Sequence, residues 1–293
     1  MILITGGTGK VGRELVRQLS TVGVSARVLV RTERSARSIR DIGLEAILGD
    51  LTDPRSIQGA LRGVKKAFLL APPSQTETDL KCRFIAAAKE AGVHQVVMVT
   101  AAGNTHYSPV FQARQHARAE DCLKTSGLCF AILQPTFFMQ NFIAQAEGIR
   151  SQGAIYGNFG EGKIAFVDAG DIASVARSCL TEDGHDRETY VVTGAESLTH
   201  NMVVEKLSAA LGKEIRYVDL PPEQSIRGMI SMGYPEWLAA DLARLAQNVA
   251  AGLFAMTTDV VERITKRPPI PFDQFLQNNL TAFASVASGG SLS

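Results

Sequence analysis

Runs of consecutive apolar residues alternate along the first half of the chain with stretches in which apolar residues recur at three- and four-residue spacing. The apolar runs are typical of strands and cover residues 2–4, 26–30, 44–48, 66–70, 95–100 and 129–134. The spaced stretches predict helices, among them residues 11–19, 56–61, 78–91 and 109–126. Strands that alternate with helices form parallel βαβ units, and strands without a polar face belong to sheets covered on both sides. We therefore predict an α/β fold built on a doubly wound parallel (Rossmann) sheet.

The regular alternation stops at Pro135. An apolar cluster and closely spaced glycines follow, and the rest of the chain is mostly helical, with further strands over 189–193 and 215–218. We expect a dinucleotide-binding Rossmann domain over residues 1–135, to which residues 165–194 return. A smaller, mostly helical C-terminal substrate-binding subdomain is expected over residues 136–164 and 195–280. Residues 281–293 are expected to be a loosely held tail.

The first strand leads directly into Gly-Gly-Thr-Gly-Lys-Val-Gly at residues 6–12. Between a strand and a helix, one glycine makes a tight turn, a second lets backbone N–H groups approach a pyrophosphate, and a third lets the helix pack closely. The helix N-terminus then faces the phosphate charge. This order predicts a dinucleotide site, and the alternative is an ordinary glycine-rich turn.

The residue after the second strand is Arg31, at the position where NAD-dependent enzymes usually carry the acid that binds the ribose 2′-OH. Arg34 and Arg37 follow, although Glu33 lies among them. Because guanidinium groups pair well with phosphate oxygens, the pattern favours NADPH over NADH. Arg37 is equally compatible with a solvated helix face.

Composition limits the classes of function. The chain has 293 residues, 45% of them hydrophobic, and a formal net charge of +1, so charge gives no reason to expect nucleic acid or an anionic membrane as a partner. The N-terminal strand lacks a basic segment before it, and we expect neither a signal peptide nor a transmembrane segment. The four cysteines show no C-x-x-C spacing, and we interpret them as reduced residues of a cytoplasmic enzyme. No cluster has metal-ligand spacing.

An ordered set of motifs lies at residues 5–12 (TGGTGKVG), 49–53 (GDLTD), 126–128 (SGL), 134–141 (QPTFFMQN), 168–173 (DAGDIA), 190–194 (YVVTG) and 265–269 (TKRPP). The set resembles the NmrA-like group of atypical short-chain dehydrogenases/reductases, in particular its quinone-reductase and triphenylmethane-reductase branch. The resemblance implies a Rossmann fold and an NADP(H) ligand. The group includes reductases of quinones, dyes and imines, and also redox-sensing regulators that bind the dinucleotide without catalysis.

Carried over position by position, the resemblance implies a set of cofactor contacts that all follow strands. The pyrophosphate would lie on Gly6, Gly7, Thr8, Gly9, Lys10, Val11 and Gly12, the 2′-phosphate on Arg31 and Arg34, and the adenine beside Asp50 and Leu51. The ribose and nicotinamide would be lined by Ala71, Pro72, Thr100, Pro135, Thr136, Phe137 and Phe138. Ligands of open α/β sheets bind at the carboxyl ends of strands, which agrees with this assignment.

The chain departs from the short-chain dehydrogenase pattern at the catalytic Tyr-x-x-x-Lys pair. Neither Tyr107 nor Tyr156 is followed four positions later by a lysine. His116 stands roughly where the lysine would be, as in the quinone-reductase branch, and a histidine can donate a proton near neutrality. We take His116 and Tyr107 as the catalytic candidates. Alternatively, His116 is a helix-surface residue paired with Glu120.

The loss of this pair suits a particular acceptor. Hydride transfer to a quinone leaves a delocalised anion, which needs less help from the protein than the alkoxide of an isolated ketone. A flat apolar substrate would also suit side chains that each could equally be core residues: Phe138, Met139, Asn141, Phe142, Met229 and Trp237. We expect some of them to line a cleft beside the nicotinamide.

The sequence therefore favours an NADPH-dependent reductase of a quinone or related extended aromatic acceptor, including a polyketide-type quinone whose hydroquinone then reacts with oxygen. Two alternatives stay open: a non-catalytic NADP(H)-sensing regulator, and an isomerase or dehydratase on the same fold. The expected partner is a small aromatic substrate, without nucleic acid, membrane or metal, and the expected state is a monomer or homodimer.

Overall fold

The computed structural model describes residues 1–284, which form two compact units. Unit 1 comprises Met1–Thr136, Ala169–Thr193 and Thr258–Pro269. Unit 2 comprises Phe137–Asp168, Gly194–Thr257 and the chain from Ile270 onward. Most of the tail expected over 281–293 lies outside the described residues. The part that is described is better packed than expected, because a short helix ends there with Phe283 fully buried.

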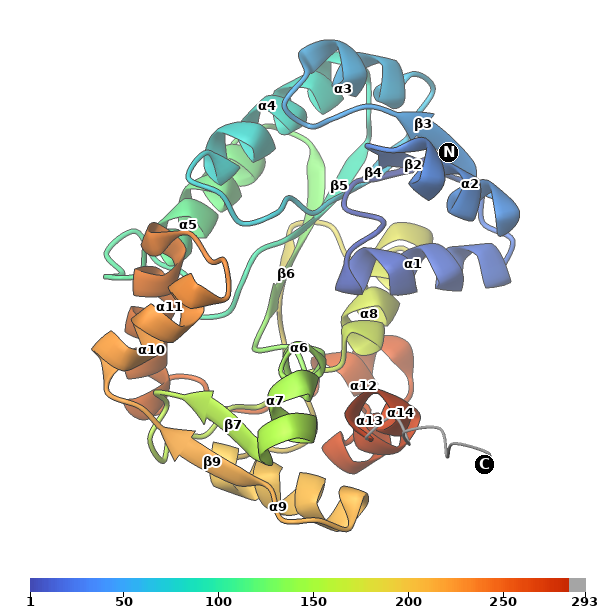
Figure 1. Ribbon diagram of the computed structural model, residues 1–293. Helices are drawn as coiled ribbons and strands as arrows, with labels where there is room; N and C mark the ends of the chain where they lie inside the picture. Colours follow the sequence, from blue (N-terminus) through green and yellow to red (C-terminus); the bar gives the residue numbers. More distant parts are fainter. Residues whose placement is uncertain (285–293) are drawn as a thin grey trace. The chain divides into compact units, whose positions relative to one another are not determined.

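Unit 1 is built on a seven-stranded sheet in which every neighbouring pair is parallel (Figure 1). Across the sheet the strands are β3 (Glu45–Leu48), β2 (Ala26–Val30), β1 (Ile2–Ile4), β4 (Lys66–Leu69), β5 (Gln95–Val99), β6 (Cys129–Pro135) and β8 (Glu188–Val192). The chain moves outward from β1 to β3 on one side and from β4 to β8 on the other. The predicted doubly wound α/β fold is confirmed.

Helices cover both faces of this sheet. One face carries three helices that follow each other around it, α3 (Pro54–Leu61), α4 (Glu77–Glu90) and α5 (Phe111–Lys124). The other face carries α1 (Lys10–Thr21) packed against α8 (Ala169–Thr181), and α12 (Val260–Thr265) packs on α8. The apolar pattern predicted no bounds for α2 (Glu33–Asp41), where Arg37 had been considered as part of a solvated helix face, because only Ala36 and Ile39 of that helix are buried.

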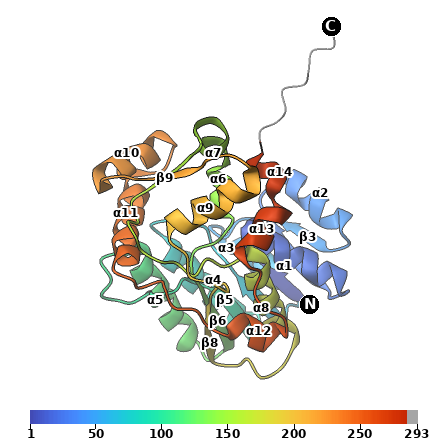
Figure 2. The same ribbon diagram turned by 90° about the horizontal axis from the view of Figure 1, so that it is seen from below.

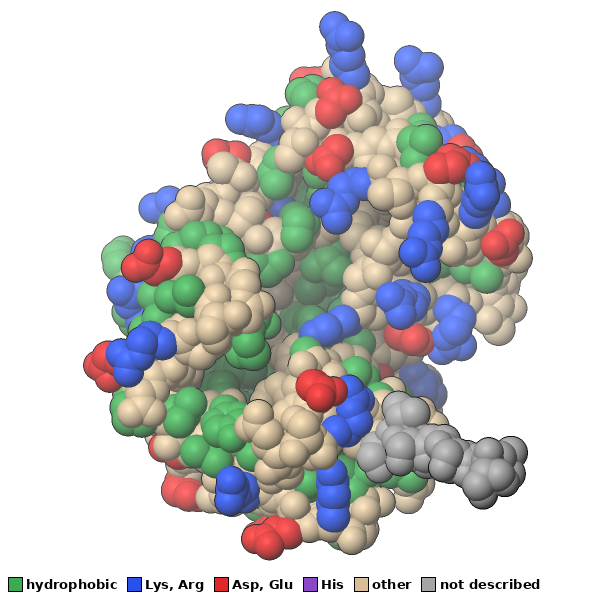
Figure 3. Space-filling model, viewed as in Figure 1, with side chains coloured by type: hydrophobic (Ala, Val, Ile, Leu, Met, Phe, Trp, Pro, Cys, Tyr) green, Lys and Arg blue, Asp and Glu red, His purple; other side chains and the backbone are tan. Residues whose placement is uncertain are grey.

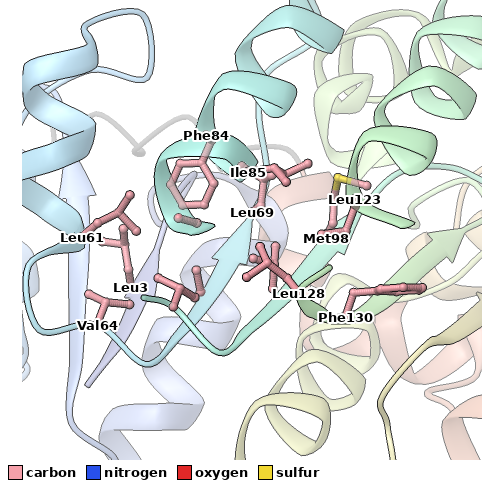
Figure 4. Packing of buried hydrophobic residues seen from close by; sticks show 14 of the residues in the cluster. Leu3, Leu61, Val64, Leu69, Phe84, Ile85, Met98, Leu123, Leu128 and Phe130 are labelled. Atoms are coloured by element: carbon pink, nitrogen blue, oxygen red, sulfur yellow. The ribbon is translucent and has the colours of Figure 1, made fainter. Parts of the chain in front are cut away.

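The core under α3, α4 and α5 explains why the strands carry no polar face. In Figure 4, strand residues such as Leu3 and Met98 meet Phe84 of α4 and Leu123 of α5. All four side chains are fully buried. Burying apolar side chains on both faces of the sheet requires continuous apolar strands, which is the pattern of the sequence.

Unit 2 has a two-stranded parallel ladder of β7 (Ala154–Gly157) and β9 (Arg216–Asp219). Its helices are α6 (Asn141–Ala144), α7 (Ala146–Gln152), α9 (His200–Leu211), α10 (Pro222–Ser231), α11 (Glu236–Ala250), α13 (Phe272–Asn278) and α14 (Leu280–Phe283). Figure 2 shows α13 beside α9, and α10 and α11 pack on each other. The sequence did not indicate β7, which lies in the glycine-rich stretch.

The cysteine interpretation was wrong for two of the four residues. Cys82 of α4 and Cys122 of α5 form a disulfide with a Cα–Cα distance of 5.6 Å. Cys129 and Cys179 are free thiols. The two bonded residues are 40 positions apart, so short-range spacing could not reveal a pair that forms only when the two helices pack together.

Within residues 1–284, no helix is both long enough and apolar enough to cross a membrane.

Candidate active site

The glycine-rich loop after β1 is packed too tightly to hold side chains at Gly7 and Gly12. A Cβ atom on Gly7 would lie 2.3 Å from Val28 Cγ1, and one on Gly12 would lie 2.1 Å from the carbonyl oxygen of Gly6. Gly6 itself has a φ of +66°, which L residues rarely adopt. The loop therefore lies directly against β2, and the first turn of α1 lies directly on the loop.

The start of α1 carries no side-chain cap. Its N-cap is Gly9, which has no side chain that could accept a hydrogen bond from the first turn. The first N–H groups of a helix have no intrahelical acceptor, and they carry the positive end of the helix dipole. The loop thus presents backbone donors at a place where an anion fits.

Arg34 lies in the first turn of α2, and the other predicted cofactor residues of unit 1 lie at the carboxyl ends of its strands. The residues are Arg31 after β2, Asp50 and Leu51 after β3, Ala71 and Pro72 after β4, Thr100 after β5, Pro135 as the last residue of β6, and Thr136 directly after it. The strand order reverses between β1 and β4, and open α/β sheets bind ligands outside the carboxyl ends of strands at such a point. Figure 3 shows Lys and Arg side chains over α1 and α2, with Asp and Glu side chains among them.

Asp50 is held as a carboxylate by its own turn. Its Oδ1 accepts hydrogen bonds from the backbone N–H of Thr52 at 2.8 Å and from the Thr52 hydroxyl at 2.7 Å. These bonds, with a smaller contribution from the charge of Arg31, lower the pKa of Asp50. Opposite charges therefore stand at the ends of the neighbouring strands β2 and β3.

His116 lies in the second turn of α5 and contacts an ion pair of α4. Its Nδ1 is 3.4 Å from Lys81 Nζ and 3.4 Å from Glu77 Oε1. Lys81 Nζ is 2.6 Å from the same Glu77 oxygen and donates to the carbonyl of Val99, the last residue of β5, at 3.0 Å. The Lys81 and Glu77 side chains are 1% and 3% exposed.

The surroundings of His116 keep its ring neutral. Burial is the main cause that places its pKa well below the ordinary value, and the positive charge of Lys81 acts in the same direction. Burial raises the pKa of Glu77, while the charge of Lys81 opposes that shift. At neutral pH, His116 is therefore a hydrogen-bonding imidazole and not an imidazolium acid.

Glu120 does not pair with His116. Its Oε1 accepts hydrogen bonds from Thr100 at 2.8 Å, Asn104 at 2.6 Å and Gln134 at 2.8 Å, and its Oε2 accepts from Lys124 at 2.9 Å. Burial acts to raise the pKa of Glu120, but these donors outweigh it and the pKa is lowered. The alternative of a surface His116–Glu120 pair was wrong, because Glu120 ties the end of β5 to β6.

Tyr107 is not brought to His116 by any contact in the structure. It lies in the loop before α5, its side chain is 94% exposed, and its backbone N–H bonds to Thr105. The structure gives its phenol no buried surroundings and no oriented position.

The predicted substrate residues of unit 2 fall into two groups. Met139 and Phe142 are core residues, since Phe142 is 2% exposed and packs edge-on against Phe166 and Phe272. The others are half-buried and present some surface: Phe138, Asn141, Met229 and Trp237. Phe137 is also half-buried and packs edge-on against its aromatic neighbours in unit 2.

Comparison with known proteins supplies the family. The model of the NmrA-like family matches residues 1–264. The chain belongs to the NmrA-like family. It is 38% identical over 286 residues to the NAD(P)H azoreductase of Xenophilus azovorans, covering 98% of this chain and all of the relative.

Two solved structures of NADP(H) complexes are similar to this NmrA-like chain. The NADPH complex of the quinone oxidoreductase QOR2 from Escherichia coli has a TM-score of 0.85 at 25% identity, covering 96% of this chain and 100% of that one. The NADP(H) complex of the triphenylmethane reductase from Citrobacter sp. has a TM-score of 0.83 at 26% identity, covering 94% and 99%.

Glu77 and Lys81, which contact His116, were not predicted from the sequence. A signal was available, because Lys81 lies three residues before Phe84 on the apolar face of the predicted helix. A lysine on a buried face is rare unless it is paired, and Glu77 lies one turn earlier to pair with it. Its contact with His116 depends on how α4 packs on α5, which the sequence does not show.

Proposed function

We propose that this chain is an NADPH-dependent reductase that transfers a hydride to a quinone or a related extended aromatic acceptor. The observation that carries the proposal is the largely buried His116 on α5, 3.4 Å from the Lys81 ammonium, in a chain that lacks the Tyr-x-x-x-Lys pair. A neutral imidazole is a weak proton donor, which suits an acceptor whose reduced form is a delocalised anion. The relatives named for azo, quinone and triphenylmethane reduction support this class of acceptor.

The residues at the carboxyl edge of the sheet fit NADPH. The uncapped start of α1 and the tightly packed glycine loop would hold the pyrophosphate, and Arg31 with Arg34 would hold the 2′-phosphate. The edge residues Asp50, Leu51, Ala71, Pro72 and Thr100 would line the adenosine and nicotinamide parts. When bound, the cofactor supplies the hydride.

The protein then has to position the acceptor beside the nicotinamide and to supply the proton that the reduced acceptor takes up. Reduction of a quinone by NADPH and one proton gives a hydroquinone and NADP⁺, so both a flat apolar site and one hydrogen-bond donor are needed. Half-buried Phe137, Phe138, Met229 and Trp237 are suitable for contact with a flat ring. A polyketide-type quinone, whose hydroquinone would then react with oxygen, is the finer form of this proposal.

The test follows NADPH absorbance while the protein is offered a panel of naphthoquinones, azo dyes, triphenylmethane dyes and a simple ketone. We expect turnover with one or more extended acceptors and none with the ketone. Tight NADPH binding without turnover on any acceptor would contradict the proposal and favour a sensing role. Turnover restricted to the isolated ketone would contradict the argument from the missing tyrosine–lysine pair.

A further inference from the structure

We propose that Lys81 is a positioning residue that holds His116 in one tautomer, with Nδ1 accepting from the Lys81 ammonium and the ring proton on Nε2. The inference rests on the proposed function in one respect, namely that Nε2–H would donate a hydrogen bond to the quinone-type substrate. The arrangement of the ring itself follows from the contacts between α4 and α5.

The three donors of Lys81 have three acceptors in the structure. A lysine ammonium has three N–H donors and no acceptor. Lys81 Nζ faces Glu77 Oε1 at 2.6 Å, the Val99 carbonyl at 3.0 Å and His116 Nδ1 at 3.4 Å. If Nδ1 carried the ring proton, the buried ammonium would keep only two acceptors. A buried donor without an acceptor costs about 1–3 kcal/mol.

In the other tautomer, Nδ1–H of His116 would donate to Glu77, and the ion pair between Glu77 and Lys81 disfavours this arrangement. Glu77 Oε1 lies 3.4 Å from Nδ1, the same separation as that between Lys81 Nζ and Nδ1, so distance does not choose between the two partners. The same Glu77 oxygen already faces the Lys81 ammonium at 2.6 Å. Donation from Nδ1 to Glu77 would leave Nδ1–H beside the Lys81 ammonium. The acceptor tautomer avoids this repulsion and satisfies every donor of the pair.

The other end of the ring remains available. Nε2 makes no hydrogen bond with any residue that the structure describes, and the His116 side chain is 14% exposed. Glu120 on the same helix is occupied by Thr100, Asn104, Gln134 and Lys124, so the charged groups that contact the ring are Glu77 and Lys81 of α4. Because Lys81 is anchored on the carbonyl of Val99, the ring is fixed to the end of β5, one residue before Thr100.

The first measurement needs only the wild-type chain without cofactor. Long-range ¹H–¹⁵N NMR distinguishes the two neutral tautomers and the charged ring of a histidine, and the His116 signals are assigned by their loss in His116→Gln. We expect Nε2–H for His116 at neutral pH. A protonated Nδ1, or a charged ring, would overturn the proposal without bearing on whether the protein reduces quinones.

The second measurement uses Lys81→Met, which keeps the stem and removes the ammonium. We expect the pKa of His116 to rise, because the opposing charge is gone and Glu77 is left unpaired, and we expect the tautomer preference to weaken. The matched control is Lys124→Met, which breaks the neighbouring lysine–glutamate pair of α5 and should leave the His116 signals unchanged. An unchanged tautomer and pKa in folded Lys81→Met would refute the role of Lys81. If that variant does not fold, the wild-type spectrum alone decides.

Kinetics with NADPH and menadione separate the role of Lys81 from the proposed function. If the wild type turns over, Lys81→Met should lower kcat by less than about 100-fold, the bottom of the range for a placed proton donor, and should leave NADPH affinity unchanged. Its kcat should also gain a dependence on pH near the ordinary pKa of histidine. A pH profile identical to that of the wild type would count against positioning, whereas absence of turnover in the wild type would count against the proposed function alone.

Discussion

At the scale of single residues, the two ends of the glycine loop have different physical reasons for being glycine. Gly6 needs a positive φ, whereas Gly12 needs space for the Gly6 carbonyl. Both requirements are imposed by the protein and not by a ligand. The loop is therefore preformed, and substitutions in it should affect stability as well as nucleotide binding.

Gly12→Ala should destabilise the fold, because its Cβ would lie 2.1 Å from a backbone oxygen that cannot move aside cheaply. We expect a loss of about 1–3 kcal/mol in the free energy of unfolding, together with weaker NADPH binding. The control is Gly59→Ala in α3, where a Cβ would meet nothing within 4 Å. That variant should gain up to about 1 kcal/mol in urea unfolding. Equal stability of the two variants would contradict the steric argument.

Arg31→Asp should reverse the cofactor preference. It would remove the guanidinium proposed to hold the 2′-phosphate, a loss of about 1.5–3 kcal/mol, and would place a carboxylate where the ribose 2′-OH of NADH could donate to it. NADPH affinity measured by fluorescence titration should fall by about 10- to 150-fold, while NADH affinity rises. Arg37→Asp, a matched charge change on α2, should alter both affinities little. Wild-type protein that binds NADH and NADPH equally would disprove the assignment.

At the scale of elements, α4 and α5 are tied together along one side. Near the start of both helices, Thr78 bonds to Gln115, and Gln115 Nε2 donates to the Gln75 carbonyl at 2.7 Å. One turn further along α4, Lys81 contacts His116, and the next residue of α4, Cys82, forms the disulfide with Cys122 of α5. The hydrogen bonds and the disulfide therefore hold α4 and α5 together on both sides of the contact between Lys81 and His116.

Reduction of the disulfide should measurably destabilise the protein. Closing a loop of 40 residues is expected to be worth about 4 kcal/mol, mainly by restricting the unfolded chain. The urea midpoint of the wild type should therefore fall in dithiothreitol, whereas the double variant Cys82→Ser with Cys122→Ser should not respond. Cys129→Ser, which removes a free thiol, should respond as the wild type does. A midpoint of the wild type that is insensitive to dithiothreitol would show that the crosslink contributes nothing.

At the scale of the whole molecule, buried histidines predict instability in acid. His200 of α9 is 3% exposed, stacks on Phe159 and Tyr217, and its Nδ1 has no hydrogen-bond partner among the described residues. Burial lowers its pKa to about 4, although the charge of Asp219 opposes the shift. His116 is shifted in the same direction.

The unfolded chain protonates these two histidines near pH 6.5, whereas the folded chain keeps them neutral. Their contribution to the free energy of unfolding is therefore fully present above pH 6.5 and is lost as the pH decreases toward 4. His200 alone should account for about 3 kcal/mol of this loss. Urea unfolding at a series of pH values should show the decline, and His200→Phe, which keeps an apolar ring in the stack, should flatten it. A decline that is identical in His200→Phe would assign the acid sensitivity to other groups.

The parts of the protein that could be predicted from its sequence are those set by local pattern. Continuous apolar strands indicate burial on both faces, and the glycine loop indicates a tight turn between strand and helix. The sheet was therefore predicted correctly, together with the residues that follow the carboxyl ends of its strands. Lys81 and the Cys82–Cys122 bond depend on the packing of two helices, which no local pattern specifies. The same limit explains why Met139 and Phe142 were expected to bind substrate although they lie in the core. Apolar residues that fill a core and apolar residues that line a pocket look alike in a sequence.

The division of the chain has a consequence for how such proteins can change by recombination. The backbone passes between the units five times, after residues 136, 168, 193, 257 and 269. A single crossover between two genes of this architecture would therefore mix segments of the two parents within at least one unit. A crossover after residue 136, for example, would combine the first 136 residues of one parent with β8, α8 and α12 of the other. Grafting of unit 2 from one such protein onto unit 1 of another would require three simultaneous segment exchanges.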